Sequence, residues 1–341
     1  MCIAAATAFA GVLRYAVDPG VVPFAAAAAA LAGLAWLVSF GTEQVGARFG
    51  PSVTGFLQST LGNLPEFFIV IFALSAGETV VAQTSIIGSL FANALLVLGL
   101  VIVVGARSSD DGRMRFGTRL PADTATLLLV SIFIIVIAGL SVASGDKASD
   151  DIKTISAIGA GCILLVYATW VWSYLRSGEK APEGAEHGAT VPLRFAIGLL
   201  AVGGVGAAFV SDWFIHALDP AIESLGISKA FAGLVIVAIA GNAVENTTGI
   251  VLALKGQSDL AISVVKNSVA QIAAFLFPAL VLTSLLFTTH LTFALAPVYI
   301  GALFFTAIAI WQITGDGEAQ EFEGWALIAI YVMLATFTLY E

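Results

Sequence analysis

Two short stretches of this chain place a carboxylate inside a hydrophobic run that is long enough to cross a bilayer. Residues Gly62 to Glu66 read GNLPE, and residues Gly241 to Glu245 read GNAVE. A charged side chain at membrane depth costs roughly 2.5 to 3.5 kcal/mol on insertion scales, and such residues mark ion or proton pathways. The motifs therefore predict such a pathway. The alternative is a structural pair of hydrogen-bonded polar residues between helices.

Neutral oxygen ligands accompany the two carboxylates. They come from the motifs and from the helix that follows each motif: Asn63, Asn242, Ser89, Asn93, Ser268 and Gln271. With two ionised glutamates, these residues would form an all-oxygen site that suits a hard cation such as Ca²⁺. No cysteine or histidine joins the cluster, which disfavours a soft transition metal.

Both motifs also contain residues that break a helix. Gly62 and Gly241 thin the helix so that a partner can approach closely. Pro65 removes one intrahelical hydrogen bond and frees a carbonyl oxygen. Val244 replaces this proline in the second motif, so the break there must come from Gly241 and its packing, or be weaker.

The same carboxylates can carry protons, because burial and a nearby like charge both favour the protonated form of a carboxyl group. Cation and protons then compete for one site. The site is close to neutral with Ca²⁺ bound or with both groups protonated, whereas the empty, doubly ionised site is costly. This penalty would couple the two fluxes.

The composition predicts the elements that must position these residues. Hydrophobic residues make up 59% of the 341 residues, charged residues only 11%, and the mean hydropathy is +0.99. The apolar runs are too long for barrel strands, so we predict an all-α integral membrane protein with about eleven transmembrane helices. The predicted segments are 1–16, 21–40, 53–76, 80–105, 121–142, 154–176, 191–217, 227–254, 259–288, 291–313 and 324–340.

The two halves of the chain repeat. Gly62 and Gly241 lie 179 residues apart, and the same offset pairs Ser89 with Ser268. An odd number of spans per half makes the second copy enter from the opposite side, which gives the inverted repeat of alternating-access transporters. The expected division is a peripheral N-terminal helix in 1–20, five helices in 21–176, a short acidic cytoplasmic linker in 177–190, and five helices in 191–341.

Charge patterning predicts orientation and partners. Most Lys and Arg residues fall in loops on one face, so the loop from Arg107 to Arg119 should be cytoplasmic. The formal net charge of −9 argues against nucleic acid and leaves the lipid bilayer as the surrounding partner. Short loops and no recognisable targeting segment suggest a bacterial plasma membrane. The sequence leaves the oligomeric state open.

The chain resembles the cation/proton exchangers of the calcium:cation antiporter superfamily. The resemblance rests on GNLPEFFIVIFALSAG and GSLFANALLVLG in the first half, and on GNAVENTTGIVLALKGQSDLA and SVAQIAAFLFP in the second. It implies ten core helices plus an amino-terminal one, exchange of Ca²⁺ for H⁺, and Glu66 and Glu245 as shared cation and proton ligands. It also implies that Asn63 and Asn242 line the passage, while the Ser, Asn and Gln residues named above complete the site.

Some positions depart from the family pattern. Asn246 stands where a His is common, Ala92 where a Ser is common, and Lys266 lies two residues before Ser268 on a predicted span. Lys266 could modify selectivity if it points at the site. It would be structural if it snorkels or pairs with an acid, the candidates being Glu43, Asp212 and Asp259. Helical spacing puts Lys266 about 200° from Ser268, which favours the structural role.

These features together predict a secondary-active antiporter without a cofactor, with Ca²⁺ as transported substrate. A Na⁺/Ca²⁺ or Na⁺/H⁺ exchanger of the same fold is the nearest alternative, although the asparagines of the two motifs favour protons. An intramembrane acid/base enzyme would require Asp residues in a GxGD-like setting, which the chain lacks. A passive channel needs no proton-tunable carboxylates at matched positions of a repeat.

Overall fold

Long apolar runs fold as helices throughout the computed structural model, because a helix satisfies its backbone hydrogen bonds within one segment. The structure describes residues 2–46, 48, 57, 61–176 and 190–341. The chain divides into two compact units: unit 1 contains Met1–Ser85, Thr169–Val244 and Leu339–Glu341, and unit 2 contains Ile86–Ala168 and Glu245–Thr338. The predicted all-α membrane fold is confirmed, with one short pair of strands added.

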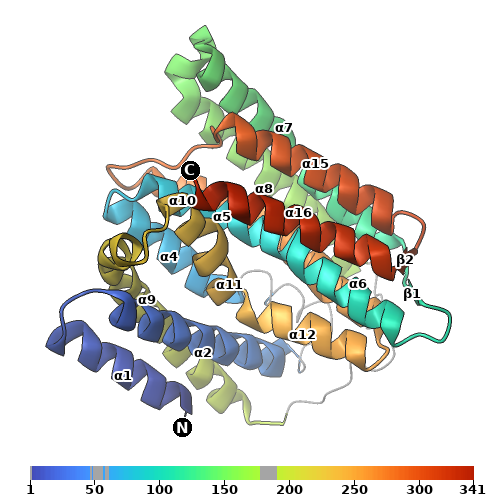
Figure 1. Cartoon of the computed structure of the whole chain (residues 1–341), viewed down its shortest axis with the longest axis horizontal. Helices are drawn as coiled ribbons and strands as arrows, with labels where there is room; N and C mark the ends of the chain where they lie inside the picture. The colour runs from blue at the N-terminus through green and yellow to red at the C-terminus, as the bar shows by residue number, and fades with distance from the viewer. Residues whose placement is uncertain (1, 47, 49–56, 58–60, 177–189) are drawn as a thin grey trace. The chain divides into compact units, whose positions relative to one another are not determined.

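Unit 1 is built around two long helices, α2 (Val21–Gly46) and α9 (Leu193–Leu225), which pack along each other. Figure 1 shows them side by side with α1. Glycine allows the close approach, since a Cβ on Gly203 would lie 2.8 Å from Val38 Cγ2. The other elements of unit 1 are α1 (Cys2–Ala16), α4 (Leu64–Ser75), the start of α5 (Thr79–Phe91), the end of α8 (Ile152–Arg176), α10 (Lys229–Phe231), η3 (Ala232–Val237), α11 (Ala238–Gly241) and the start of α12 (Ala243–Leu254).

A partly exposed network of two ion pairs holds one end of unit 1 together. Lys229 Nζ lies 2.7 Å from Glu78 Oε2 and 2.9 Å from Asp219 Oδ1. Glu78 stands in the turn after α4, Asp219 on α9 and Lys229 at the start of α10. The network therefore ties the turn after the first motif helix to the segment that leads into the second motif.

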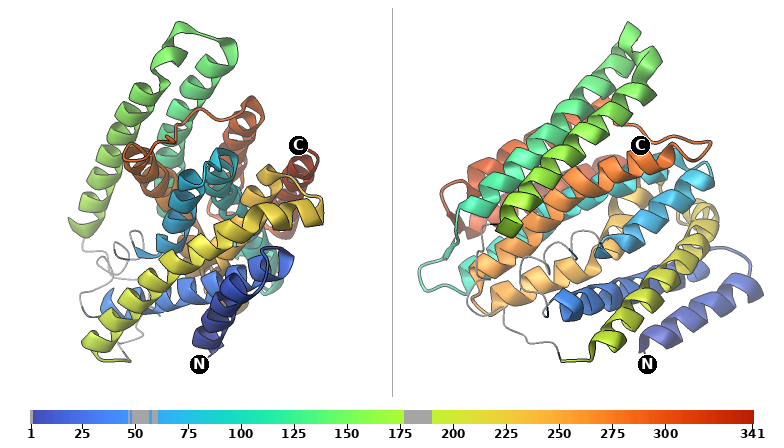
Figure 2. Two further views of the ribbon diagram at one scale, coloured as in Figure 1. Left: turned by 90° about the vertical axis from the view of Figure 1, so that its left-hand side faces the viewer. Right: turned by 180° about the vertical axis from the view of Figure 1, so that it is seen from behind.

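Unit 2 centres on long helices that slant in similar directions in the right-hand view of Figure 2. Helix α7 (Arg119–Ser144) packs against α13 (Ser258–Gln271) and against α15 (Pro297–Thr314). The remaining elements are the end of α5, η1 (Ala92–Val97), α6 (Leu98–Arg107), β1 (Arg113–Arg115), η2 (Lys147–Asp151), most of α8, the rest of α12, η4 (Ile272–Leu276), α14 (Phe277–Ser284), β2 (Glu318–Gln320) and α16 (Glu321–Leu339).

The number of spans agrees with the prediction only in part. Among the described residues, eight helices are long and apolar enough to cross a membrane, and a ninth span results if the broken pair Lys229–Gly241 and Asn246–Leu254 is counted as one. Two further apolar helices, Cys2–Ala16 and Leu64–Ser75, are shorter. Part of the predicted segment 53–76 and nearly all of the linker 177–190 lie outside the described residues, so the count of eleven stays a prediction.

Two predicted helix boundaries are wrong. The segment predicted at 291–313 begins only at Pro297, because buried residues before it are irregular and bond to side chains: the Leu291 amide donates to Ser284 Oγ, and the Phe293 amide donates to Ser156 Oγ. Proline is well suited to the first helical turn. The segment predicted to end at 217 continues to Leu225, with Pro220 inside the helix.

Among the described residues, three π-helical segments interrupt the spans, and the sequence analysis did not predict them. They are η1, η3 and η4. The repeat offset of 179 residues relates η1 (Ala92–Val97) to residues 271–276, which almost coincide with η4 (Ile272–Leu276). Short π turns inside α-helices are frequent at functional sites. The segments η1 and η4 begin within about one helical turn after Ser89 and Ser268, at matching points of the two halves.

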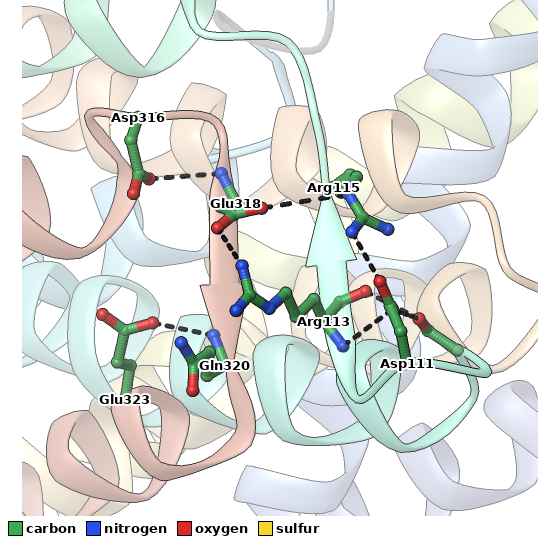
Figure 3. Close-up of polar contacts among 8 residues, drawn as sticks. Asp111, Arg113, Arg115, Asp316, Glu318, Gln320 and Glu323 are labelled. Atoms are coloured by element: carbon green, nitrogen blue, oxygen red, sulfur yellow. Dashed lines mark hydrogen bonds and ion pairs between the residues drawn. The ribbon is translucent and has the colours of Figure 1, made fainter.

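A two-stranded antiparallel sheet, the β1–β2 pair, lies at one end of unit 2. Strand β1 pairs antiparallel with β2, and Met114 and Ala319 form its buried centre. Figure 3 shows the charged residues around it: Arg113 Nη1 lies 2.6 Å from Glu318 Oε1, and Arg115 pairs with Asp111. The β1–β2 pair thus links the connection between α6 and α7 to the connection between α15 and α16.

The charge of Asp111, beside the β1–β2 pair, should stay constant over the pH range of transport. The Arg115 guanidinium, followed by the Ser109 hydroxyl, lowers the pKa of Asp111 from 3.8 to about 2. A lowered carboxyl pKa stabilises the fold above the unfolded-state value and loses this contribution only as the pH falls towards 2. We expect Asp111→Asn to leave the pH profile of ion uptake between about pH 5 and 8 unchanged. A displaced profile in that range would contradict this assignment.

Candidate functional site

The first motif places Glu66 in the opening turn of helix α4. The chain turns at Gly62 and Asn63, Asn63 caps the helix, and Pro65 lies in the first turn, where its missing amide hydrogen is not needed. Glu66 is only 5% exposed. The proline therefore starts a new helix after a break instead of kinking a continuous one, and the carboxylate lies near the positive end of the helix dipole.

Asn242 from the second motif binds this carboxylate. Its Nδ2 atom donates to Glu66 Oε1 at 2.6 Å and to the Ala238 carbonyl oxygen at 2.9 Å. Asn242 is 1% exposed and lies between α11 and α12, with non-helical φ and ψ of −102° and 17°. Within unit 1, the structure thus brings the asparagine of one motif to the glutamate of the other.

Gly241 is the reason why Glu66 can approach so closely. A Cβ at this position would lie 2.8 Å from Glu66 Cγ and 3.2 Å from Glu66 Oε1. The sequence analysis expected this glycine to admit a partner backbone. The partner is instead the side chain of the buried carboxylate.

Glu245 occupies the same place in its helix as Glu66 does in α4. It is the third residue of α12 (Ala243–Leu254), as Glu66 is the third residue of α4 (Leu64–Ser75). Its side chain lies outside what the structure describes. The predicted meeting of the two carboxylates therefore stays a prediction.

The remaining predicted ligands are buried or half-buried. Ser89 lies in the last turn of α5 and Asn93 lies in η1, and Asn93 Nδ2 donates to the Ser89 carbonyl oxygen at 2.9 Å. Ser268 is buried on α13, Gln271 is the half-buried last residue of that helix, and η1 packs against α13. Unit 2 thus brings the polar pairs of both halves onto adjoining helices, while Asn63 is buried in unit 1.

Lys266 is completely buried in unit 2, and its amine is held by a hydroxyl group. Nζ donates to Thr314 Oγ1 at 3.0 Å, and no carboxylate among the described residues of unit 2 forms an ion pair with it. The expected partner Asp259 instead accepts a hydrogen bond from the Gly117 amide. Lys266 therefore does not reach the surface within unit 2, and pairing with Asp259 is ruled out in this structure.

The sequence analysis missed two hydroxyl residues that contact α13. Thr124 and Ser131 on α7 both bond to backbone carbonyls of the segment that carries Ser268 and Gln271. Their seven-residue spacing, which places them on one face of the helix, was the signal that could have found them.

A buried carboxylate beside a broken helix, in a fold of long apolar helices, defines a membrane transporter of ions. The chain belongs to the sodium/calcium exchanger protein family, whose sequence model matches residues 20–175 and 195–340. It is a transporter and not an enzyme. The family match falls on either side of the central polar linker.

Individual relatives agree with this family. The chain is 32% identical over 319 residues to the vacuolar calcium ion transporter of Schizosaccharomyces pombe, covering 89% of this chain and 76% of that protein. It is 30% identical over 334 residues to the Ca(2+)/H(+) antiporter ChaA of Bacillus subtilis, covering 93% and 92%. The solved structure of native YfkE is similar with a TM-score of 0.84 at 28% identity, covering 99% of this chain and 98% of that chain.

The contact of Gly241 with Glu66 can be tested by adding one methyl group. Gly241→Ala places a Cβ within 2.8 Å of Glu66 Cγ and should displace the carboxylate. We expect a rise of roughly 5- to 150-fold in the Ca²⁺ concentration for half-maximal uptake, because overpacking costs about 1 to 3 kcal/mol. The matched control is Gly198→Ala on α9, where a Cβ would meet nothing within 4 Å. Equal Ca²⁺ dependence in the two variants would contradict the contact.

Proposed function

We propose that this protein exchanges Ca²⁺ for H⁺ across a membrane by alternating access. The observation that carries the proposal is the buried Glu66 carboxylate, which receives a hydrogen bond from Asn242 inside a break between helices. A carboxylate at this depth is stable when it is protonated or when it binds a cation. The relatives named for calcium transport and for Ca²⁺/H⁺ antiport support the choice of ions.

Glu66 and Glu245 act as the shared ligands of the cation and the protons. Each is the third residue of a helix that follows a Gly-Asn pair, and the Glu66 carboxylate lies near the positive end of its helix. Neutral oxygens complete the coordination of Ca²⁺, which takes 6 to 8 oxygen ligands. We assign these oxygens to Asn63, Asn242, Ser89, Asn93, Ser268 and Gln271.

Asn242 has a second task, which is to keep Glu66 in place through both ionic states. Its amide donates to Glu66 Oε1 and is itself oriented by the Ala238 carbonyl. The Asn242 amide can donate to Oε1 whether the Glu66 carboxyl group is ionised or protonated, since the proton can reside on Oε2. Proton loss and Ca²⁺ binding then occur without a rearrangement of the helix break.

Lys266 takes a structural part in this assignment, since its amine bonds to Thr314 on α15. A selectivity role would instead require the ammonium to reduce the negative charge of the site. Lys266→Met separates the two roles: a changed preference between Ca²⁺ and a monovalent cation would favour the selectivity role.

We assign the protein to a bacterial plasma membrane, with the loop from Arg107 to Arg119 on the cytoplasmic side. In unit 2, three arginines lie around the β1–β2 pair, near the start of α7: Arg107, Arg113 and Arg115. Lys153 and its partner His290 lie beyond the end of α7 at Ser144. A 26-residue helix is about 39 Å long, so these groups belong to opposite faces. The excess of Arg near the β1–β2 pair supports the assignment of this face to the cytoplasm.

Reconstituted vesicles test the proposal directly. An imposed pH gradient should drive ⁴⁵Ca²⁺ uptake by the wild-type protein, and an imposed Na⁺ gradient should not. Glu66→Gln and Glu245→Gln should each reduce proton-driven uptake by roughly 100-fold, the factor for a loss of about 3 kcal/mol. The control is Glu223→Gln, which removes an exposed carboxylate from α9. Uptake driven by Na⁺ alone, or retained in Glu66→Gln, would contradict Ca²⁺/H⁺ exchange through this site.

A further inference from the structure

Helix α7 holds the segment of α13 and η4 that carries Ser268 and Gln271. Thr124 Oγ1 donates to the Lys266 carbonyl oxygen at 3.3 Å, and Ser131 Oγ donates to the Ala273 carbonyl oxygen at 2.9 Å. Both hydroxyl residues are 1% exposed. All of these residues belong to unit 2.

The two contacts share one spacing. Thr124 and Ser131 are seven residues apart on α7, and the carbonyls that they bind, of Lys266 and Ala273, are also seven residues apart. Seven residues are close to two helical turns, so each set lies on one face. The helices therefore run parallel here, and a slip of one residue along α13 would break both hydrogen bonds together.

The contact of Ser131 with Ala273 lies where α13 changes to π-helical structure. Ala273 is the second residue of η4, and Ser131 Oγ also lies 3.1 Å from the carbonyl oxygen of Leu127 on its own helix. A π turn alters the regular carbonyl pairing of a helix. The single hydroxyl hydrogen of Ser131 is therefore within reach of one carbonyl on α7 and of one carbonyl in the π turn, and the π-turn carbonyl is the nearer.

A third polar contact holds the same segment from α15. Lys266 Nζ donates to Thr314 Oγ1 at 3.0 Å, and the Thr314 hydroxyl donates in turn to the Ile310 carbonyl oxygen at 2.6 Å. The Lys266 end of the segment is thus fixed through its backbone by α7 and through its side chain by α15.

The other half of the repeat lacks these hydroxyl groups. The residues 179 positions after Thr124 and Ser131 are Leu303 and Ile310 on α15, the helix that packs against η1. Their side chains cannot donate hydrogen bonds. The polar contacts to the π turn are therefore a feature of the second half alone among the described residues of unit 2.

We propose that Thr124 and Ser131 are positioning residues that fix the register of residues 266–273 and thereby aim Ser268 and Gln271 at the transported cation. The inference rests on the proposed function, which assigns these two side chains as oxygen ligands. Loss of the contacts lowers Ca²⁺ affinity, because a shifted register moves both ligands. The maximal rate of exchange changes less than the affinity does.

The test compares variants of the full-length protein. Ser131→Ala and Thr124→Val each remove one donor, and the double variant removes both. The matched control is Thr126→Val on the same helix, since the exposed Thr126 hydroxyl bonds only to the Ala122 carbonyl of α7 itself. Ser131→Thr is the conservative variant, which keeps a hydroxyl group at this position. Ca²⁺ binding is measured by calorimetry, alongside proton-driven uptake in vesicles and the melting temperature.

We expect Ser131→Ala and Thr124→Val to weaken Ca²⁺ binding by about 3- to 20-fold each, the range of interhelical hydrogen bonds in membranes. Ser131→Thr should return the affinity to near the wild-type value, and Thr126→Val should leave it unchanged. A lower melting temperature with unchanged Ca²⁺ affinity would overturn the proposal, as would affinities equal to that of the control.

The two proposals fail in different ways in these measurements. Wild-type protein that binds Ca²⁺ but takes it up without a pH gradient would contradict the proposed exchange and leave the affinity comparison decisive for Thr124 and Ser131. Wild-type protein that does not bind Ca²⁺ would overturn both.

Discussion

The fold of unit 1 depends on the burial of one carboxylate with its donor. Glu66 is almost inaccessible, so its charge needs a proton, a cation or a directed hydrogen bond. Asn242 supplies the hydrogen bond, and Gly241 supplies the space. Because both come from the second motif, neither half of the chain can complete this arrangement alone. Both motifs are therefore needed to hold this carboxylate.

The helix breaks explain how this arrangement is compatible with a membrane. Backbone groups that leave a helix at membrane depth need other partners, and irregular backbone is tolerated only where protein buries it. At the second break, Asn242 turns its side chain to the Ala238 carbonyl and to Glu66 with the same amide group. At the first break, Asn63 begins a new helix, and its carbonyl accepts from the Phe67 amide. Asn242 thus satisfies a backbone carbonyl and binds the carboxylate with the same amide group, while the Asn63 carbonyl is the first backbone acceptor of α4.

The sequence predicted the membrane helices and the two polar breaks within them, because both follow from composition, spacing or helix-breaking residue types. That Asn242 lines the ion passage stays a prediction, and the structure shows its hydrogen bond to Glu66. The sequence did not predict that Gly241 receives the side chain of Glu66, since a contact across 175 residues has no local signal. The π turns η1 and η4 were also missed, because their residues are ordinary helix formers. The irregular residues before Pro297 were predicted as helix, since apolar composition does not distinguish a buried extended segment from a helix.

The central claim is that Glu66 exchanges a proton for Ca²⁺. Infrared difference spectroscopy of the purified protein measures this exchange at the carboxyl group itself. Addition of Ca²⁺ at a mildly acidic pH should remove a protonated-carboxyl band and add carboxylate bands, and the part of this change due to Glu66 should be absent from Glu66→Gln. An identical Ca²⁺-induced spectrum in the wild type and in Glu66→Gln would contradict the claim.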